Sequence, residues 1–416
     1  MPTRLGRRST PTALRGGTAR YRAALHTTGA VRYYAASLPI RFGAAMLSLS
    51  VLVMVHAATG GYARAGAVTG VLAAASTVGG PLAARVTDRY GPRRVLPPLV
   101  TGHAVAVATL AGAVTAGLPD PLWYAAATVA GLCTPAAGAL TRARWSALAP
   151  NPDVLTTGLA IESLTDDLTF VIGPGAATVL AAAVQPVLGP LLTALLVLVG
   201  GVAMAAQRQP GAIRRPPSGT PVAARALGAL ATPAVRVVAV AFVATGMVFS
   251  GVQVSLAAAT AGYGHAAAAG PIYGCFGIAS MCAGFGYGAV GWRSTPVRRV
   301  VVGFVALAAG CAVLPFASGL GALAVAVAVP GLAVAPTVIA GNTVVERGTP
   351  AGRLAEAFAW LGGACSLGVA VGSALAGRIV DRYGPHAGFL LPVAACVAAA
   401  AFVAWSSARR GRVSAR

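Results

Sequence analysis

The chain has 416 residues, of which 57% are hydrophobic and only 10% are charged, and its mean hydropathy is +0.76. This composition lies far outside the range of soluble globular domains, so we expect a protein embedded in a membrane. The net charge of +22 would favour nucleic acid binding in a soluble protein. Here the basic residues lie in short stretches between apolar runs, which is typical of topology signals, and no nucleic acid partner is expected.

The first element is a basic tail over residues 1–32, which we predict to be cytoplasmic and to touch lipid headgroups. The pair Arg7-Arg8 resembles part of an export signal, but no export core follows it, and cleavage is not expected. All basic residues are arginine, and alanine and glycine are abundant. This bias suggests GC-rich coding DNA and a bacterial source.

Apolar runs separated by charged or Gly/Pro-rich breaks then follow along the chain. They predict spans near 37–57, 65–86, 95–117, 121–143, 157–184, 187–206, 236–259, 266–291, 299–317, 320–342, 354–378 and 386–407. Each is close to the roughly 20 residues that a helix needs to cross a bilayer, and runs this long exclude a β-barrel. The predicted fold is therefore an all-α integral membrane protein with about twelve transmembrane helices.

The polar stretch at 207–232 divides these spans into two groups of six. We predict an N-terminal bundle over 33–206, a cytoplasmic linker over 207–232, a C-terminal bundle over 233–408 and a cytoplasmic tail over 409–416. Two pseudo-symmetric six-helix bundles are the arrangement that secondary transporters use for alternating access. With alternating helices most arginines fall on one side, so both termini of this multi-pass protein are expected in the cytoplasm, at the cell membrane.

The loop after the second span carries a DRYGP motif followed by two arginines. It resembles the loop between helices 2 and 3 of the major facilitator superfamily, and the matching residues are Asp88, Arg89, Gly91, Arg93 and Arg94. The resemblance implies a secondary transporter of the drug or small-molecule efflux-like branch. It also implies that this loop is a conformational latch in which Asp88 faces the start of helix 11, as a carboxylate near a helix N-terminus is stabilised. The alternative is that the arginines only set the topology.

The fifth span holds three of the nine acidic residues of the chain, Glu162, Asp166 and Asp167. Charged groups at membrane depth are costly, so they line a cavity, pair with other charges or carry protons. One interpretation gives these acids a role in proton coupling or in the substrate cavity. The other places them at the cytoplasmic rim, paired with Arg142 and Arg144.

Residues 173–177 of the same span read Gly-Pro-Gly-Ala-Ala. They resemble the Gly-Pro-x-x-Gly-Gly signature of exporting, proton-antiporting branches of the superfamily, with the paired glycines replaced. Gly173 and Pro174 are expected to bend the helix and permit close helix packing. The arginine that those branches carry inside helix 4 is missing here, because 122–140 contains no basic residue.

Other spans contain isolated polar residues. Arg41, early in the first span, could complement the helix-5 acids across the cavity, but snorkelling to the inner surface is favoured. His56 and His103 are interpreted as structural.

The second DRYGP, at 381–385, lies an odd number of spans after the first and lacks the arginine pair. It is therefore expected on the outer side as a tight turn and not as a second latch.

The sequence thus predicts a proton-coupled exporter of small molecules that works by alternating access, as a monomer. An importer, symporter or facilitator of the same fold is the alternative. No catalytic cluster, phosphate-binding loop or metal-ligand spacing appears, so we expect no enzyme activity, no cofactor beyond a proton gradient and no metal.

Overall fold

The computed structural model describes residues 26–148, 150, 152–207, 232–289, 293–349 and 354–414. Helices make up the described N-terminal half: α2 (Thr28–Thr59), α3 (Tyr62–Tyr90), α4 (Pro92–Thr115), α5 (Asp120–Leu132), α6 (Ala137–Leu148), α7 (Pro152–Ala183) and α8 (Leu188–Ala206). Those of the C-terminal half are α10 (Pro233–Gly262), η1 (Ala266–Ala268), α11 (Ala269–Ala289), α12 (Pro296–Val313), η2 (Leu314–Phe316), α13 (Leu320–Gly348), α14 (Leu354–Tyr383), α15 (Pro385–Gly388) and α16 (Leu390–Ser414). The expected all-α membrane fold is confirmed.

Ten of the described helices are long and apolar enough to cross a bilayer. The fifth span is the long helix α7, whose apolar stretch is the shorter Val171–Ala183. The fourth span, predicted as one run, is broken into α5 and α6 around Pro135, which cannot donate a backbone hydrogen bond. The fourth and fifth spans are the two that the count of ten leaves out, so the expected number of about twelve spans agrees with the structure.

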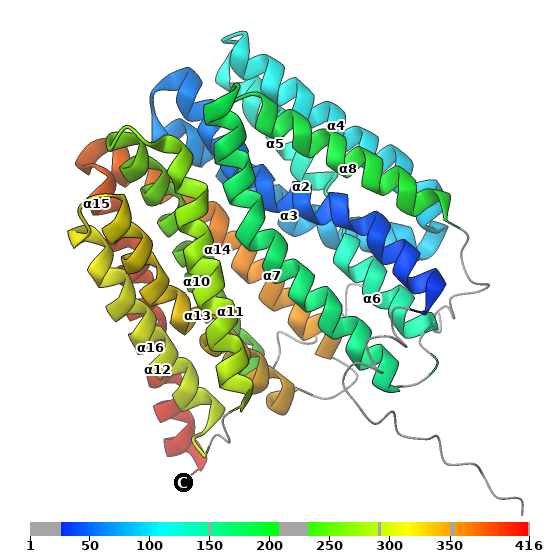
Figure 1. Cartoon of the computed structure of the whole chain (residues 1–416). Coiled ribbons are helices and arrows are strands. Elements are labelled where there is room, and N and C mark those ends of the chain that lie inside the picture. Colours follow the sequence, from blue (N-terminus) through cyan, green and yellow to red (C-terminus); the bar gives the residue numbers. More distant parts are fainter. Residues whose placement is uncertain are drawn as a thin grey trace, which may run out of the picture.

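The two halves pack by the same scheme. In the N-terminal half α2 contacts α7 and α8, and α3 contacts α5; in the C-terminal half α10 contacts α14 and α16, and α11 contacts α13. Figure 1 shows the resulting bundles side by side, with α7 and α14 along the junction. This repeated packing is the pseudo-symmetry that the division at 207–232 predicted.

The halves meet through two helix pairs, α3 with α14 and α7 with α11. We call the side at which α2 begins and α16 ends the terminal face, and the opposite side the far face. A Cβ atom at Gly66 would clash with the Ser373 carbonyl oxygen, and one at Gly270 with the Pro174 carbonyl oxygen. Since these residues lie in the far-face halves of their helices, the bundles are in close contact there.

Toward the terminal face the same helices are more exposed. Val78, Leu82 and Val86 of α3 are 54%, 46% and 43% exposed, and Trp360 of α14 is 37% exposed. Gly66 is covered by α14 of the opposite bundle. The large apolar side chains nearer the terminal face have no such cover. The structure is therefore closed at the far face and splayed toward the terminal face.

Candidate functional site

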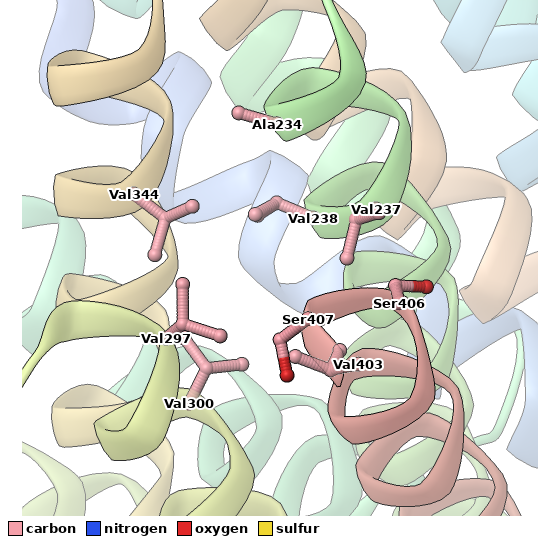
Figure 2. A pocket seen from close by; sticks show the side chains of 9 residues that line it. All are labelled: Ala234, Val237, Val238, Val297, Val300, Val344, Val403, Ser406 and Ser407. Carbon is pink, nitrogen blue, oxygen red and sulfur yellow. The ribbon is translucent and has the colours of Figure 1, made fainter. Parts of the chain in front are cut away.

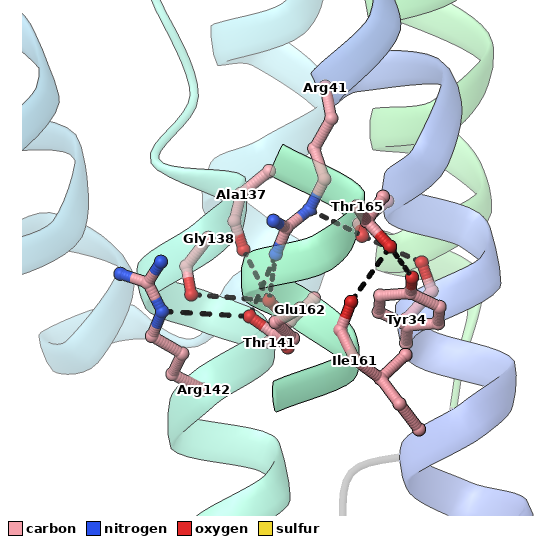
Figure 3. A network of polar contacts seen from close by, with 10 residues as sticks. Tyr34, Arg41, Ala137, Gly138, Thr141, Arg142, Ile161, Glu162 and Thr165 are labelled. Carbon is pink, nitrogen blue, oxygen red and sulfur yellow. Dashed lines mark hydrogen bonds and ion pairs between the residues drawn. The ribbon is translucent and has the colours of Figure 1, made fainter. Parts of the chain in front are cut away.

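A buried ion pair joins the first and fifth spans. The Glu162 Oε2 atom in α7 lies 2.9 Å from Arg41 Nη2 in α2, and the two side chains are 0% and 4% exposed. Figure 3 shows both side chains pointing toward one another between α2, α6 and α7. The favoured expectation that Arg41 snorkels to the surface is wrong, because a buried carboxylate holds its guanidinium inside the bundle.

Hydroxyl groups hold the Arg41 guanidinium in place. Its Nη2 donates to Thr141 Oγ1 at 2.6 Å, and its Nε donates to Ser37 Oγ at 3.3 Å. Thr141 belongs to α6, so the segment after the break in the fourth span supplies a ligand for the buried cation. Taking two charges out of water costs free energy, which an ion pair with further hydrogen bonds offsets only in part.

The Glu162 carboxylate is only half satisfied. Its Oε2 atom also lies 3.7 Å from Nε of Arg142, a residue whose side chain is 52% exposed. Its Oε1 atom is buried and has no hydrogen-bond partner among the described residues. A buried polar atom without a partner is rare and marks strain, a functional role or an exchangeable ligand. Oε1 thus marks this carboxylate as a candidate for a functional role.

Each of the two interpretations of the acids in the fifth span agrees with part of this geometry. Glu162 contacts the interior Arg41 and also the rim residue Arg142. The guanidinium carbon of Arg144 lies 4.9 Å from the centre of the Tyr33 ring. The side chains of Asp166 and Asp167 lie outside the described part of the structure, so their predicted role stays a prediction.

The first DRYGP motif forms a tight turn between α3 and α4. Gly91 has a φ of +83°, which side-chain-bearing residues rarely adopt, and Pro92 begins α4. Arg93 and Arg94 follow in the first turn of α4, and both are exposed. The Arg89 guanidinium lies 5.2 Å from the centre of the Tyr90 ring. The Asp88 side chain is outside the described residues, and the latch stays a prediction.

The second DRYGP motif does more than form a turn. Gly384 has a φ of +85° and Pro385 begins α15, as expected for a tight bend. In addition, Asp381 Oδ1 accepts a hydrogen bond from the Tyr62 backbone N–H at 2.7 Å, and Oδ2 accepts one from Ala63 at 2.6 Å. The last turn of α14 therefore caps the N-terminus of α3 across the two bundles. The interpretation as a turn alone was incomplete.

A cavity of about 290 Å³ is lined mainly by helices of the N-terminal bundle, with two residues of α14 from the C-terminal bundle. Ile40, adjacent to Arg41 in the chain, lines it, as do Thr134 and Pro135 from the break between α5 and α6. Irregular backbone at membrane depth is tolerated where it faces such a cavity. The remaining lining residues are Ala44, Leu47, Ser48, Thr69, Leu72, Ala73, Ser76, His103, Val197, Ser366 and Val369.

His103 is the titratable side chain of this cavity wall. Its Nδ1 atom lies 2.8 Å from the Ala130 carbonyl oxygen, which only accepts hydrogen bonds, so Nδ1 carries the proton. Its Nε2 atom is buried without a hydrogen-bond partner in the part of the chain that the structure describes, and in the neutral ring this atom is an acceptor. The interpretation of His103 as a structural residue explains the contact of Nδ1 with the Ala130 carbonyl but gives no role to Nε2. Only the three-dimensional grouping around the cavity identifies this atom as a possible ligand contact.

The predicted bend residues lie where α7 approaches its neighbours. A Cβ atom at Gly173 would come within 2.8 Å of Ala45 Cβ in α2, and the Pro174 carbonyl faces Gly270 of α11. Thr178, one turn later, donates to the Ala267 carbonyl at 3.1 Å. The expected close packing is present, and the segment belongs to the far-face junction.

Another cavity, of about 240 Å³, lies inside the C-terminal bundle near the terminal face. Figure 2 shows side chains of α10, α12, α13 and α16 pointing into it: Ala234, Val237, Val238, Val297, Val300, Val344, Val403, Ser406 and Ser407. It carries no charged group, unlike the region around Glu162. Among the described residues no cluster of three His, Cys, Asp or Glu side chains is placed to hold a metal ion.

Comparisons with known proteins agree with this architecture. A family model described as Major Facilitator Superfamily matches residues 34–320. No curated protein sequence matches the chain. Among solved structures, a mutant of the nucleoside transporter NupG aligns with a TM-score of 0.74 at 14% identity, covering 92% of this chain and 99% of that chain. The human organic anion transporter MFSD10 aligns with a TM-score of 0.60, also at 14% identity and with coverage of 92% and 99%.

Proposed function

Because the chain belongs to the Major Facilitator Superfamily, we propose that it is a secondary transporter that exports a small molecule in exchange for protons by alternating access. The observation that carries the proton coupling is the buried pair of Glu162 and Arg41, with Oε1 of the carboxylate unpartnered. Ionisable groups inside a membrane bundle are expensive, and proton relays are one of the uses that retain them.

The pair supplies a simple exchange mechanism. A proton on Glu162 neutralises the carboxylate and removes its attraction for Arg41, which keeps its bonds to Thr141 and Ser37. Ile40, the residue before Arg41 in α2, lines the cavity that we propose for the substrate. A change in the position of Arg41 therefore alters the cavity wall, which links proton binding to substrate release. Asp166 and Asp167 are proposed to extend the proton path along α7, and Gly173 and Pro174 to let α7 bend as the bundles move.

Alternating access requires a lock at each face. Asp381 closes the far face by capping α3, and we assign the corresponding lock at the terminal face to Asp88, with Arg89, Gly91, Arg93 and Arg94 shaping its loop. Each acid lies at the C-terminal end of one helix of the α3–α14 pair. The two DRYGP motifs thus act in opposite conformations.

The proposed location is the cell membrane with both termini in the cytoplasm. The excess of arginine on the terminal face supports this orientation. We propose that a single chain is the transporting unit, because residues from both of its halves line the cavity.

Reconstituted vesicles test the proposal. The protein is placed in liposomes with a pH-sensitive dye inside and challenged with a panel that includes nucleosides and organic anions, since similar structures carry those names. A substrate-dependent proton flux is expected for at least one compound. Glu162→Gln should abolish this flux, while Asp120→Asn, which alters an acid whose side chain is 40% exposed, should preserve it. Proton flux retained in Glu162→Gln would contradict coupling at this site.

Uptake by the same machinery is the second candidate. The direction is determined with right-side-out and inverted vesicles under one imposed pH gradient. Accumulation in inverted vesicles with an acidic interior supports export, whereas accumulation only in right-side-out vesicles in an acidic medium supports proton-driven import.

A further inference from the structure

A groove of about 650 Å³ lies on the C-terminal bundle, between the end of α11 and the helices α12 and α13. Its walls include Tyr287, Arg298, Arg299, Val302, Val329 and Leu332. The groove has a charged end and an apolar end. It is separate from the cavity that His103 lines, and the transport mechanism above does not use it.

The charged end carries two arginines and no acid among its lining residues. Arg298 and Arg299 lie in the first turn of α12, at the positive end of the helix dipole. The Thr295 side chain accepts from the Arg298 backbone N–H at 3.4 Å and so fixes the helix start. Arg299 Nη1 donates to the Tyr287 hydroxyl, which holds that guanidinium at the mouth of the groove. Such a fork of N–H donors favours phosphate oxygens.

The apolar end continues directly from the arginines along the helices. Val302, Val329 and Leu332 are 58%, 44% and 52% exposed. At 1.5 Å per residue, Ala306 lies about 11 Å along α12 from Arg299. The groove therefore places cationic groups at the helix end and an apolar channel below them, inside the membrane-spanning part.

The position of α12 decides what reaches this groove. α12 packs against α13 and α16 of its own bundle. Figure 1 shows it on the outer edge of the C-terminal bundle, away from the N-terminal bundle. In a membrane this edge faces lipid, and basic pockets between helices at the membrane boundary are suited to anionic headgroups.

We propose that this groove binds one anionic phospholipid, with its phosphate at Arg298 and Arg299 and an acyl chain along Val302, Val329 and Leu332. The complementary charge selects an anionic over a zwitterionic lipid, and the apolar channel selects a lipid over free phosphate. The lipid would join the ends of α11 and α12 to α13. The inference requires only that the bundle lies in a bilayer, so it is independent of transport direction and proton coupling.

Native mass spectrometry of the full chain, released from nanodiscs with equal amounts of phosphatidylglycerol and phosphatidylcholine, tests the proposal. We expect one phosphatidylglycerol to be retained preferentially. The variant Arg298→Gln/Arg299→Gln should lower this preference by about thirtyfold, from the loss of two arginines near the headgroup. Arg236→Gln is the matched control, because Arg236 follows the same Thr-Pro helix start at α10 but does not line the groove.

A second variant keeps the arginines and fills the channel. Ala306→Trp should reduce retention of phosphatidylglycerol while the fold, checked by circular dichroism, is unchanged. Equal retention of both lipids by the wild type, or unchanged retention in the double arginine variant, would overturn the proposal. Displacement of the lipid by an equal concentration of glycerol phosphate would also overturn it, since the acyl chain would then contribute nothing.

Discussion

The carboxylate of Asp381 at the end of α14 accepts a hydrogen bond from the backbone N–H of Tyr62 at the start of α3, 319 residues earlier in the chain. The second oxygen accepts from Ala63, so a single side chain satisfies two N–H groups of a helix start that has no acid of its own. A carboxylate at a helix N-terminus is stabilised by both the hydrogen bonds and the helix dipole. The contact joins the two bundles at the face where they are closed.

Removal of the Asp381 charge should favour opening of the far face. Asp381→Asn keeps the shape but loses the charge and one acceptor, and we expect about a two- to fivefold increase in the far-open fraction. Spin labels on cysteines at Leu118 and Phe316, in far-face connections of the two halves, report the opening by double electron–electron resonance. Asp120→Asn on the same face is the control. An unchanged distance distribution in Asp381→Asn would show that the contact does not hold the face closed.

The buried ion pair should show strong coupling in stability. Arg41→Gln leaves Glu162 buried without its main partner and should destabilise the fold by about 3–5 kcal/mol. Glu162→Gln removes the carboxylate charge that faces Arg41 and should also destabilise the fold. The double variant Arg41→Gln/Glu162→Gln should recover much of the loss, because neither charge is then buried alone.

Thermal or denaturant unfolding in detergent measures this cycle. The sum of the two single effects should exceed the effect of the double variant by more than about 1 kcal/mol, as expected for residues in contact. Strict additivity would mean that the 2.9 Å contact contributes no coupling energy.

The glycine contacts at the far face give a steric prediction. Gly66→Ala places a methyl group against the Ser373 carbonyl, and the α3–α14 pair must separate to accommodate it. We expect a larger far-open fraction by the same spin-label measurement. Gly80→Ala in the same helix is the matched control, since a Cβ atom there meets nothing within 4 Å. Equal behaviour of the two variants would argue against close packing at Gly66.

Local sequence patterns predicted most of the spans and the turns at Gly91 and Gly384, because hydropathy and backbone conformation depend on a few neighbouring residues. The pairing of Arg41 with Glu162 depends on the angle between α2 and α7, which no local pattern encodes. The cap by Asp381 depends in the same way on how the two bundles meet. The break in the fourth span had a signal in Pro135, but the apolar run around it favoured one continuous helix.

The unpartnered Nε2 of His103 gives a final prediction for substrate recognition. His103→Asn can keep a side-chain N–H near the Ala130 carbonyl but removes the Nε2 acceptor of a residue that lines the cavity. If a substrate N–H or O–H binds Nε2, its apparent affinity should fall by about tenfold, the effect of one lost hydrogen bond in a buried site. The measurement is the concentration dependence of initial transport rates for a compound found in the vesicle panel. His103→Leu removes both bonds, so a loss of stability seen there but not in His103→Asn assigns the Ala130 contact to folding. Unchanged affinity in His103→Asn would mean that substrate does not contact this ring.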